Sequence, residues 1–307
     1  MPKKFEWYYI DLHSDDGYDL VFKWHTEPFM SVFRNGLIDC FLYLNGKQIC
    51  HYVIVYPQER LVFRKEPLKL GYDNFAEFNK TNGRYLLKIQ HAHFKLELEF
   101  ENLLPDKFCE VENLNPDPGD PDIFIWKLIS PLSSGKARIA WMDDEWEISG
   151  RTYFDYNAGD MFFKKKLKSW IWQKVYLENE LFIGGQINSK NNWIRDLLIH
   201  IDSNGIKKIN NGRLRMIDRN IYISGDEITT TLNLTEIKRI DNIRFFTGAE
   251  SSLMNKIREA GSYFSGKLPT YLPLNLLLSN VHYRRYKGNG QDSSGQKIFS
   301  FREEINF

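Results

Sequence analysis

Alternating apolar and polar side chains predict short antiparallel strands along most of the chain. The clearest run is AHFKLELEF, in which Phe94, Leu96, Leu98 and Phe100 alternate with charged or polar residues. A period of two places one set on each face of a strand, so this run predicts a strand with one buried face. We expect it to form the end of one strand over residues 84–100.

Turn signals and strand rhythm set the expected organisation. Asn45-Gly46, after an apolar run, is a strong hairpin signal. Beyond residue 170, short strands and turns alternate every 8–12 residues or so, a rhythm that favours a barrel or a sandwich. The same rhythm occurs in both halves, with a break near residues 142–150. We therefore expect two domains, 1–146 and 147–307.

One segment alone has a clear helical pattern. In ESSLMNKIREAG, residues 250–261, Leu253, Ile257 and Ala260 fall on one side. Glu250 and the serines favour its start, and Gly261 favours its end. The chain is thus expected to be all-β apart from this short helix near its C-terminal end.

Composition narrows the function classes. Apolar residues make up 42% and charged residues 26%, as in a typical globular protein, whereas aromatic residues reach 15%. The net charge of +1 gives no reason to expect a nucleic-acid partner. Three cysteines without a CxxC motif predict neither a disulfide framework nor a thiolate metal site. We expect no metal and no cofactor.

The N-terminal residues lack an apolar signal core, and no apolar stretch of about 18 residues occurs, so we expect no integral membrane span. Cytoplasm is the expected compartment. The sequence sets no oligomeric state.

The stretch GRTYFDYNAGD, residues 150–160, holds the main candidate chemistry. If it is extended, Asp155 and Asn157 lie on one face, and Trp170 and Trp172 show the same spacing downstream. A carboxyl group among indoles and phenols would form an apolar pocket with one proton-handling group, in which burial disfavours the charged carboxylate. The alternative is structural: Asp and Asn with a nearby glycine are common in turns, and tryptophans in strands are usually core.

Three places give the chain a resemblance to a known family. These are the opening EWYYIDLHSDDGYDLVFKWHTEPF, the central GRTYFDYNAGD and the strand WIWQKVYL. Together they resemble the two-domain lipocalin-like group that includes carotenoid 1,2-hydratases (hydroxyneurosporene synthases), AttH-like proteins and lipocalin-like Diels–Alderases. The resemblance implies two lipocalin-like antiparallel β-barrels in tandem with a short C-terminal helix.

The central stretch matches the family signature Gly-x-Gly-Tyr-His-Asp-His-Asn-x-Gly only in part. The matching residues, beyond the first glycine, are Tyr153, Asp155, Asn157 and Gly159. Thr152 replaces the second glycine, and Phe154 and Tyr156 replace the two histidines. In the hydratases those histidines are implicated in protonating a polyene. Their loss leaves a single aspartate, with phenols nearby, as the candidate Brønsted acid.

Three functions remain open. The first is a cofactor-independent enzyme that protonates an alkene of a hydrophobic polyene or terpenoid-like substrate, leading to cyclisation, hydration or isomerisation. The second is a pericyclase, resembling a Diels–Alderase, that works mainly by positioning its substrate. The third is a non-catalytic lipocalin-like binder of an apolar small molecule. A hydrophobic substrate also leaves room for a transient membrane contact during its uptake.

The expected site residues fall into two sets. The catalytic candidates are Asp155, Tyr156 and Asn157. The substrate-binding candidates are Tyr153, Trp170, Trp172, Tyr176, His25 and Trp24. The substrate pocket is expected inside one barrel or between the two.

Overall fold

The structure, a computed structural model, describes residues 5–27, 35–57, 61–64, 69–104, 111–244, 282–292 and 294–307. The helix expected at 250–261 lies outside these residues. The described chain is almost entirely β-structure, as predicted, with one short helix, α1 (Phe163–Lys166). It separates into two compact units. Unit 1 takes the described residues between 1 and 109 and Trp126–Ala158, and unit 2 takes those between 110 and 125, 159 and 247, and 273 and 307.

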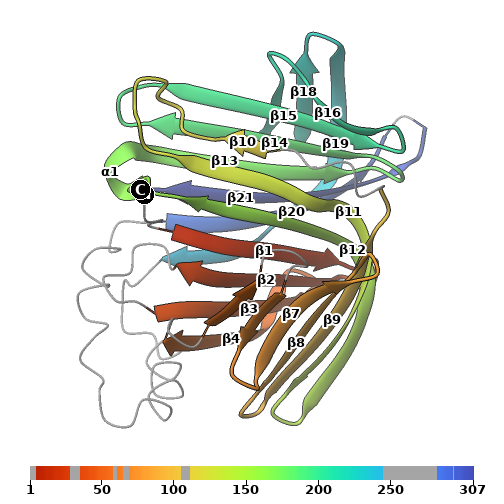
Figure 1. Cartoon of the computed structure of the whole chain (residues 1–307). Coiled ribbons are helices and arrows are strands. Elements are labelled where there is room, and N and C mark those ends of the chain that lie inside the picture. Colours follow the sequence, from red (N-terminus) through yellow and green to blue (C-terminus); the bar gives the residue numbers. More distant parts are fainter. Residues whose placement is uncertain are drawn as a thin grey trace. The chain divides into compact units, whose positions relative to one another are not determined.

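Unit 1 is built on an antiparallel sheet whose strand order is β4-β3-β2-β1-β12-β11-β9-β8-β7-β6-β5 (Figure 1). Its strands are β1 (Phe5–His13), β2 (Tyr18–Glu27), β3 (Asn35–Leu44), β4 (Lys47–Pro57), β5 (Leu61–Arg64), β6 (Lys69–Tyr72), β7 (Ala76–Thr81), β8 (Arg84–His91), β9 (Phe94–Asn102), β11 (Phe124–Trp141) and β12 (Asp144–Gly159).

The sheet of unit 1 curls until distant strands meet. The ring of Tyr52 on β4 stacks on Phe94 of β9 at 4.4 Å, and Tyr56 on β4 lies 4.4 Å from Tyr72 on β6. These contacts join β4, at one edge of the sheet, to β9 in its middle and to β6 near the opposite edge. The curled sheet encloses a core of apolar side chains that includes Phe154.

Unit 2 contains a second antiparallel sheet, in the order β16-β15-β14-β13-β21-β20-β19-β18-β17. Its strands are β13 (Leu167–Tyr176), β14 (Leu181–Ser189), β15 (Ile194–Asp202), β16 (Gly205–Lys208), β17 (Arg213–Ile217), β18 (Asn220–Gly225), β19 (Ile228–Arg244), β20 (His282–Gln291) and β21 (Lys297–Asn306), while the short β10 (Val111–Asn113) pairs with β11. A Cβ built on Gly184 of β14 would lie 2.3 Å from Cβ of Leu214 on β17, so this sheet also curls back on itself.

The expected alternation in AHFKLELEF is confirmed, because its apolar residues are buried and its charged residues exposed along β9. The single strand expected over residues 84–100 is wrong. It is a hairpin of β8 and β9, which turns at Ala92 and His93.

The break expected near residues 142–150 is likewise a hairpin, between β11 and β12, with its turn at Met142 and Asp143. The expected domain boundary, between residues 146 and 147, falls within β12, whose residues up to Ala158 lie in unit 1.

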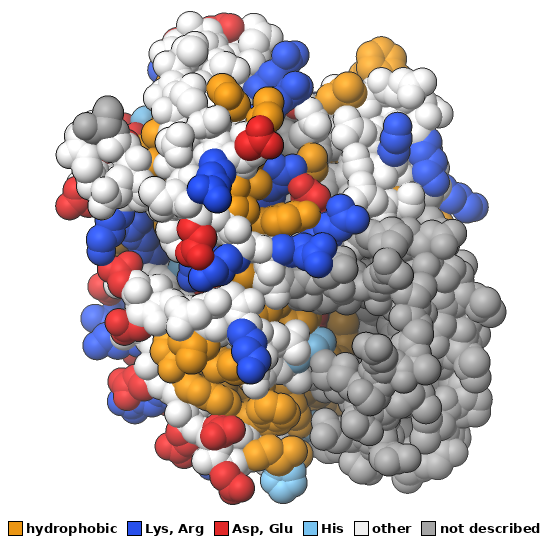
Figure 2. Space-filling model, turned by 180° about the vertical axis from the view of Figure 1, so that it is seen from behind, with side chains coloured by type: hydrophobic (Ala, Val, Ile, Leu, Met, Phe, Trp, Pro, Cys, Tyr) orange, Lys and Arg blue, Asp and Glu red, His pale blue; other side chains and the backbone are white. Residues whose placement is uncertain are grey.

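On the face shown in Figure 2, acidic and basic side chains are interspersed over the described residues. Cys40 and Cys50 are buried free thiols. The described part of the chain contains no helix with the length and hydropathy needed to span a bilayer.

Candidate functional site

Asp155 lies at the centre of a buried hydrogen-bonded group in unit 1. Its Oδ2 accepts hydrogen bonds from the Tyr153 hydroxyl at 2.6 Å and the Trp126 indole N–H at 3.0 Å, and its Oδ1 accepts one from Asn157 Nδ2 at 2.8 Å. Asp155 is only 4% exposed. Because β12 is extended here, Tyr153, Asp155 and Asn157 share one face, so the structure forms a strand where the alternative interpretation required a turn.

The residues around Asp155 determine how its carboxyl group can hold and release a proton. Three donors directed at one carboxyl group stabilise its ionised form inside the protein. The Tyr153 hydroxyl can also accept a hydrogen bond, so it is the neighbour that can change roles if Asp155 takes up a proton. The buried Asn157 Oδ1 receives no hydrogen bond from any described residue. It is therefore an acceptor that a ligand hydroxyl can use.

Tyr156 faces the other side of β12. Its ring packs against the core of unit 1, 5.0 Å from the ring of Tyr8, and its hydroxyl donates to Glu6 Oε1 at 2.5 Å. Thr26 donates to Glu6 Oε2 at 2.6 Å. Burial raises the pKa of Tyr156, and the hydrogen bond to Glu6 and its charge raise it further. The hydroxyl of Tyr156 uses its one proton in the hydrogen bond to Glu6. Because Tyr156 and Asp155 lie on opposite faces of β12, the structure does not bring them together.

The candidates on β2 also point in opposite directions. Trp24 is fully buried, and its indole N–H donates to the Tyr56 hydroxyl at 2.5 Å within the core of unit 1. His25 lies on the other face, 5.8 Å from the ring of Trp7. Burial lowers the pKa of His25 to about 3, and the charge of Lys23 lowers it too, against an opposing effect of Asp39. Its buried Nδ1 has no hydrogen-bond partner among the described residues.

The aromatic candidates of unit 2 form one row. Trp170, Trp172 and Tyr176 alternate along β13 and therefore share a face. The Trp170 ring lies 6.5 Å from Trp172 and 5.0 Å from Phe124. Lys174 lies in the same row and is 1% exposed, which makes it a candidate that the sequence analysis missed. Lysine is so rarely buried that its type gave no reason to single it out.

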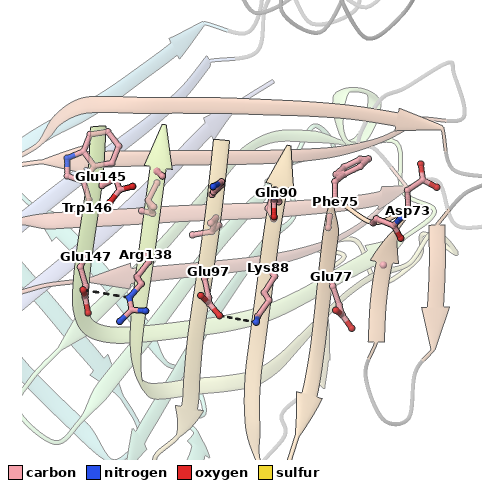
Figure 3. A pocket seen from close by; sticks show the side chains of 18 of the residues that line it. Asp73, Phe75, Glu77, Lys88, Gln90, Glu97, Arg138, Glu145, Trp146 and Glu147 are labelled. Atoms are coloured by element: carbon pink, nitrogen blue, oxygen red, sulfur yellow. Dashed lines mark ion pairs between the residues drawn. The ribbon is translucent and has the colours of Figure 1, made fainter. Parts of the chain in front are cut away.

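A hollow of about 1030 Å³ lies on the outer face of β6–β9, β11 and β12 in unit 1 (Figure 3). Six of the charged residues that line it pair across neighbouring strands: Lys88 with Glu97 at 3.0 Å, Arg138 with Glu147 at 3.7 Å, and Lys69 with Glu77 at 3.5 Å. None of the predicted site residues lines it. Cross-strand ion pairs account for these six residues as sheet-stabilising contacts on a solvated face.

The described residues include no cluster of three or more His, Cys, Asp or Glu side chains that would hold a metal ion. His91 and His93, which share a spacing of two in the sequence, are separated by the β8–β9 turn. His91 ends β8 and its Nδ1 lies 2.8 Å from the Tyr52 hydroxyl, whereas His93 is an exposed turn residue.

Comparisons with known proteins identify the fold. No protein-family model matches the chain, and no curated protein matches its sequence. Among solved structures, a putative AttH from Nitrosomonas europaea matches with a TM-score of 0.59 at 14% identity, covering 99% of this chain and 92% of that one. CghA in complex with Sch210972 matches with a TM-score of 0.59 at 8% identity, covering 99% and 88%.

Kievitone hydratase from Nectria haematococca matches with a TM-score of 0.52 at 8% identity, covering 99% of this chain and 89% of that one. The expected resemblance to AttH-like proteins is thus confirmed at the level of the fold. Identities this low carry no activity across. The chain has the two-domain lipocalin-like fold, with nearly its whole length matched to each of these structures.

Proposed function

We propose that this protein is a cofactor-independent enzyme that acts on a hydrophobic polyene or terpenoid-like substrate, with Asp155 as its proton-handling residue. The observation that carries the proposal is the convergence of Tyr153, Trp126 and Asn157 on the buried Asp155 carboxyl. Structures of the same fold include a protein named as a hydratase, which supports an enzymatic role for the fold.

In the proposed chemistry, Asp155 is protonated before the reaction, and the Tyr153 hydroxyl is turned to accept a hydrogen bond from the carboxyl group. The proton then passes from Asp155 to an alkene carbon, and the Tyr153 hydroxyl turns back to donate to the carboxylate. The carbocation that forms is stabilised by the carboxylate left behind, whose charge is spread over hydrogen bonds from three donors. Asn157 Oδ1 would accept a hydrogen bond from a water or from a substrate hydroxyl. The fate of the cation is then cyclisation, hydration or loss of a proton to give an isomer.

A pericyclase is the second candidate. In this alternative the hydrogen bonds to Asp155 only fix the local structure, and the aromatic row Trp170, Trp172 and Tyr176 shapes a surface that holds the reacting ends close together. The gathering of the indole and phenol rings of β13 on one face of the strand favours this alternative. A lipocalin-like binder without turnover would use the same row for affinity alone.

The test is mass spectrometry of organic extracts from cells that produce the wild type or Asp155→Asn. If Asp155 is catalytic, the variant accumulates an isomer of the wild-type product, or a precursor lighter by one water. The matched control is Glu147→Gln, which replaces an exposed carboxylate on the same strand and should leave the products unchanged.

Identical metabolites from wild type and Asp155→Asn would reject the acid role, provided that circular dichroism shows both proteins folded. Retention of an apolar compound by the purified variant would then favour the binder or the pericyclase.

A further inference from the structure

A primary amine lies inside the aromatic row of unit 2. Lys174 stands between Trp172 and Tyr176 on β13, on the same face as both, because it alternates with them along the strand. It is 1% exposed. A lysine with almost no solvent contact, placed among rings proposed to meet an apolar substrate, calls for a chemical explanation.

The next two strands of the sheet, β21 and then β20, supply part of the surroundings of the amine. Lys174 is paired with Phe301 of β21, and its Nζ lies 5.2 Å from the centroid of that ring. On β20 the fully buried Arg285 donates from Nε to Glu303 Oε1 at 3.1 Å and to the Tyr283 hydroxyl at 3.0 Å. Tyr283 also donates to Glu303 Oε1. Arg285 and Glu303 are therefore held in fixed positions on a sheet, not on mobile loops.

These surroundings favour the neutral amine. The pKa of Lys174 is lowered to about 7: burial is the main cause, the charge of Glu303 acts against it, and the charge of Arg285 adds to it. An ordinary lysine has a pKa of about 10.4 and stays an ammonium ion at neutral pH. Only a neutral amine has the lone pair that attacks a carbonyl carbon, and desolvated lysines serve this purpose in enzymes.

We propose that Lys174 is a carbonyl-binding residue that forms an imine with an apolar aldehyde or ketone. In this step the amine nitrogen bonds to the carbonyl carbon, both amine hydrogens pass to the carbonyl oxygen, and that oxygen leaves as water. The step is reversible and involves no oxidant or reductant. The inference rests on the proposed function in one respect, since it narrows the apolar substrate to the class that carries a carbonyl group.

The experiment uses all-trans-retinal, an apolar polyene aldehyde, as the probe. Purified full-length protein is incubated with retinal and sodium cyanoborohydride from pH 6 to pH 9, and the labelled lysines are located by peptide mass mapping. At pH 8 we expect label at Lys174 to exceed that at any exposed lysine by roughly tenfold or more, because an ordinary lysine is almost fully protonated there. Labelling of Lys174 should rise with an inflection near pH 7.

Two variants control for non-specific reaction. Lys174→Arg should abolish the dominant label, whereas Lys287→Arg should keep it. Lys287 is a matched control. It lies on the same face of β20, the second strand from β13, is 8% exposed and has its Nζ 5.2 Å from the Phe299 ring. If Lys174→Arg does not fold, the peptide map of the wild type still shows whether Lys174 is the dominant labelled lysine.

Label confined to exposed lysines in the wild type would overturn the inference, as would the same label intensity in folded Lys174→Arg. The result is independent of the Asp155 experiment. Selective label at Lys174 with unchanged metabolites in Asp155→Asn supports the carbonyl site and rejects the acid role. The reverse pattern rejects only the carbonyl site.

Discussion

The side chains of residues 153–157 divide between two faces of β12, and that division separates the matches to the family signature from the departures. The matching Tyr153, Asp155 and Asn157 form the hydrogen-bonded group, whereas Phe154 and Tyr156 pack on the core side of unit 1. Replacement of the two signature histidines by aromatic residues therefore alters the face that Asp155 does not use. The group around Asp155 is complete without an imidazole.

His25 should stay neutral throughout the physiological pH range. Its pKa is lowered to about 3, mainly by burial, so the imidazole carries no charge above about pH 4. An NMR titration of the histidine C2 protons should show no inflection for His25 between pH 5 and pH 8, whereas an unperturbed histidine titrates near 6.5. The His25→Gln variant identifies the resonance by its loss. An inflection near pH 6.5 would show that the ring is solvated.

Some contacts of the candidate site can be predicted from the sequence and others cannot. Tyr153, Asp155 and Asn157 could be grouped because their spacing is local and a strand places such residues on one face. Trp126 and Glu6 could not, because they are 29 and 150 residues away from their partners Asp155 and Tyr156, and only the order of strands in the sheet brings them together. Nothing in the composition of β1 or β11 indicates which strand lies beside β12.

Hairpins, too, can be predicted from the sequence only where the residue types of the turn indicate one. Asn45-Gly46 is recognisable in the sequence because Asn and Gly readily adopt positive φ, and the structure gives them φ values of 51° and 78°. The two missed hairpins turn at Ala92, with φ of 49°, and at Met142, with φ of 56°. Neither residue type signals a left-handed conformation, so the sequence alone predicts one strand over residues 84–100 and no hairpin at residues 142–143.

Gly184 and Gly185 of β14 leave room for a neighbouring side chain on each face of the strand. A Cβ on Gly185 would lie 2.5 Å from Cζ3 of Trp172, and one on Gly184 would meet Leu214. Gly185→Ala should therefore displace the Trp172 indole and lower the free energy of unfolding by about 1–3 kcal/mol, the usual cost of overpacking. Urea denaturation measures the stability, and tryptophan fluorescence emission reports the displacement.

Gly119→Ala is the control for that substitution. Its nearest neighbour would be Asp117 Oδ1 at an ordinary 3.5 Å, so we expect a change within about 0.5 kcal/mol. Equal stabilities of the two alanine variants, with unchanged emission, would mean that the Trp172 ring moves aside at no cost.

Both units contain strands that are buried on both faces and carry buried polar or ionisable side chains. Antiparallel sheets more commonly expose one face to water. In unit 1 the buried strand β1 carries Asp11 and His13 as well as apolar residues, and in unit 2 the buried part of β13 carries Gln173 and Lys174. Burial of ionisable groups costs stability unless they are paired or neutral. The fold therefore holds groups whose protonation in the native state differs from that in the unfolded chain.

The protonation of Lys174 should make the free energy of unfolding depend on pH. Its native pKa of about 7 lies below the value of about 10.4 expected in the unfolded chain. Between these values the unfolded state binds more protons than the native state, so the free energy of unfolding rises with pH. Below about pH 7 both states are protonated, and the cost of burying the charge is fully present.

From pH 7 to pH 9 the wild type should therefore gain about 2 kcal/mol relative to Lys174→Met, as measured by urea denaturation at each pH. Other titrating groups contribute equally to both proteins and cancel in the difference, and Lys95→Met, at an exposed position, should show no such divergence. Parallel pH profiles for the wild type and Lys174→Met would mean that the amine stays charged in the native protein. In that case it would lack the lone pair that imine formation needs, and selective retinal labelling at pH 8 should fail as well.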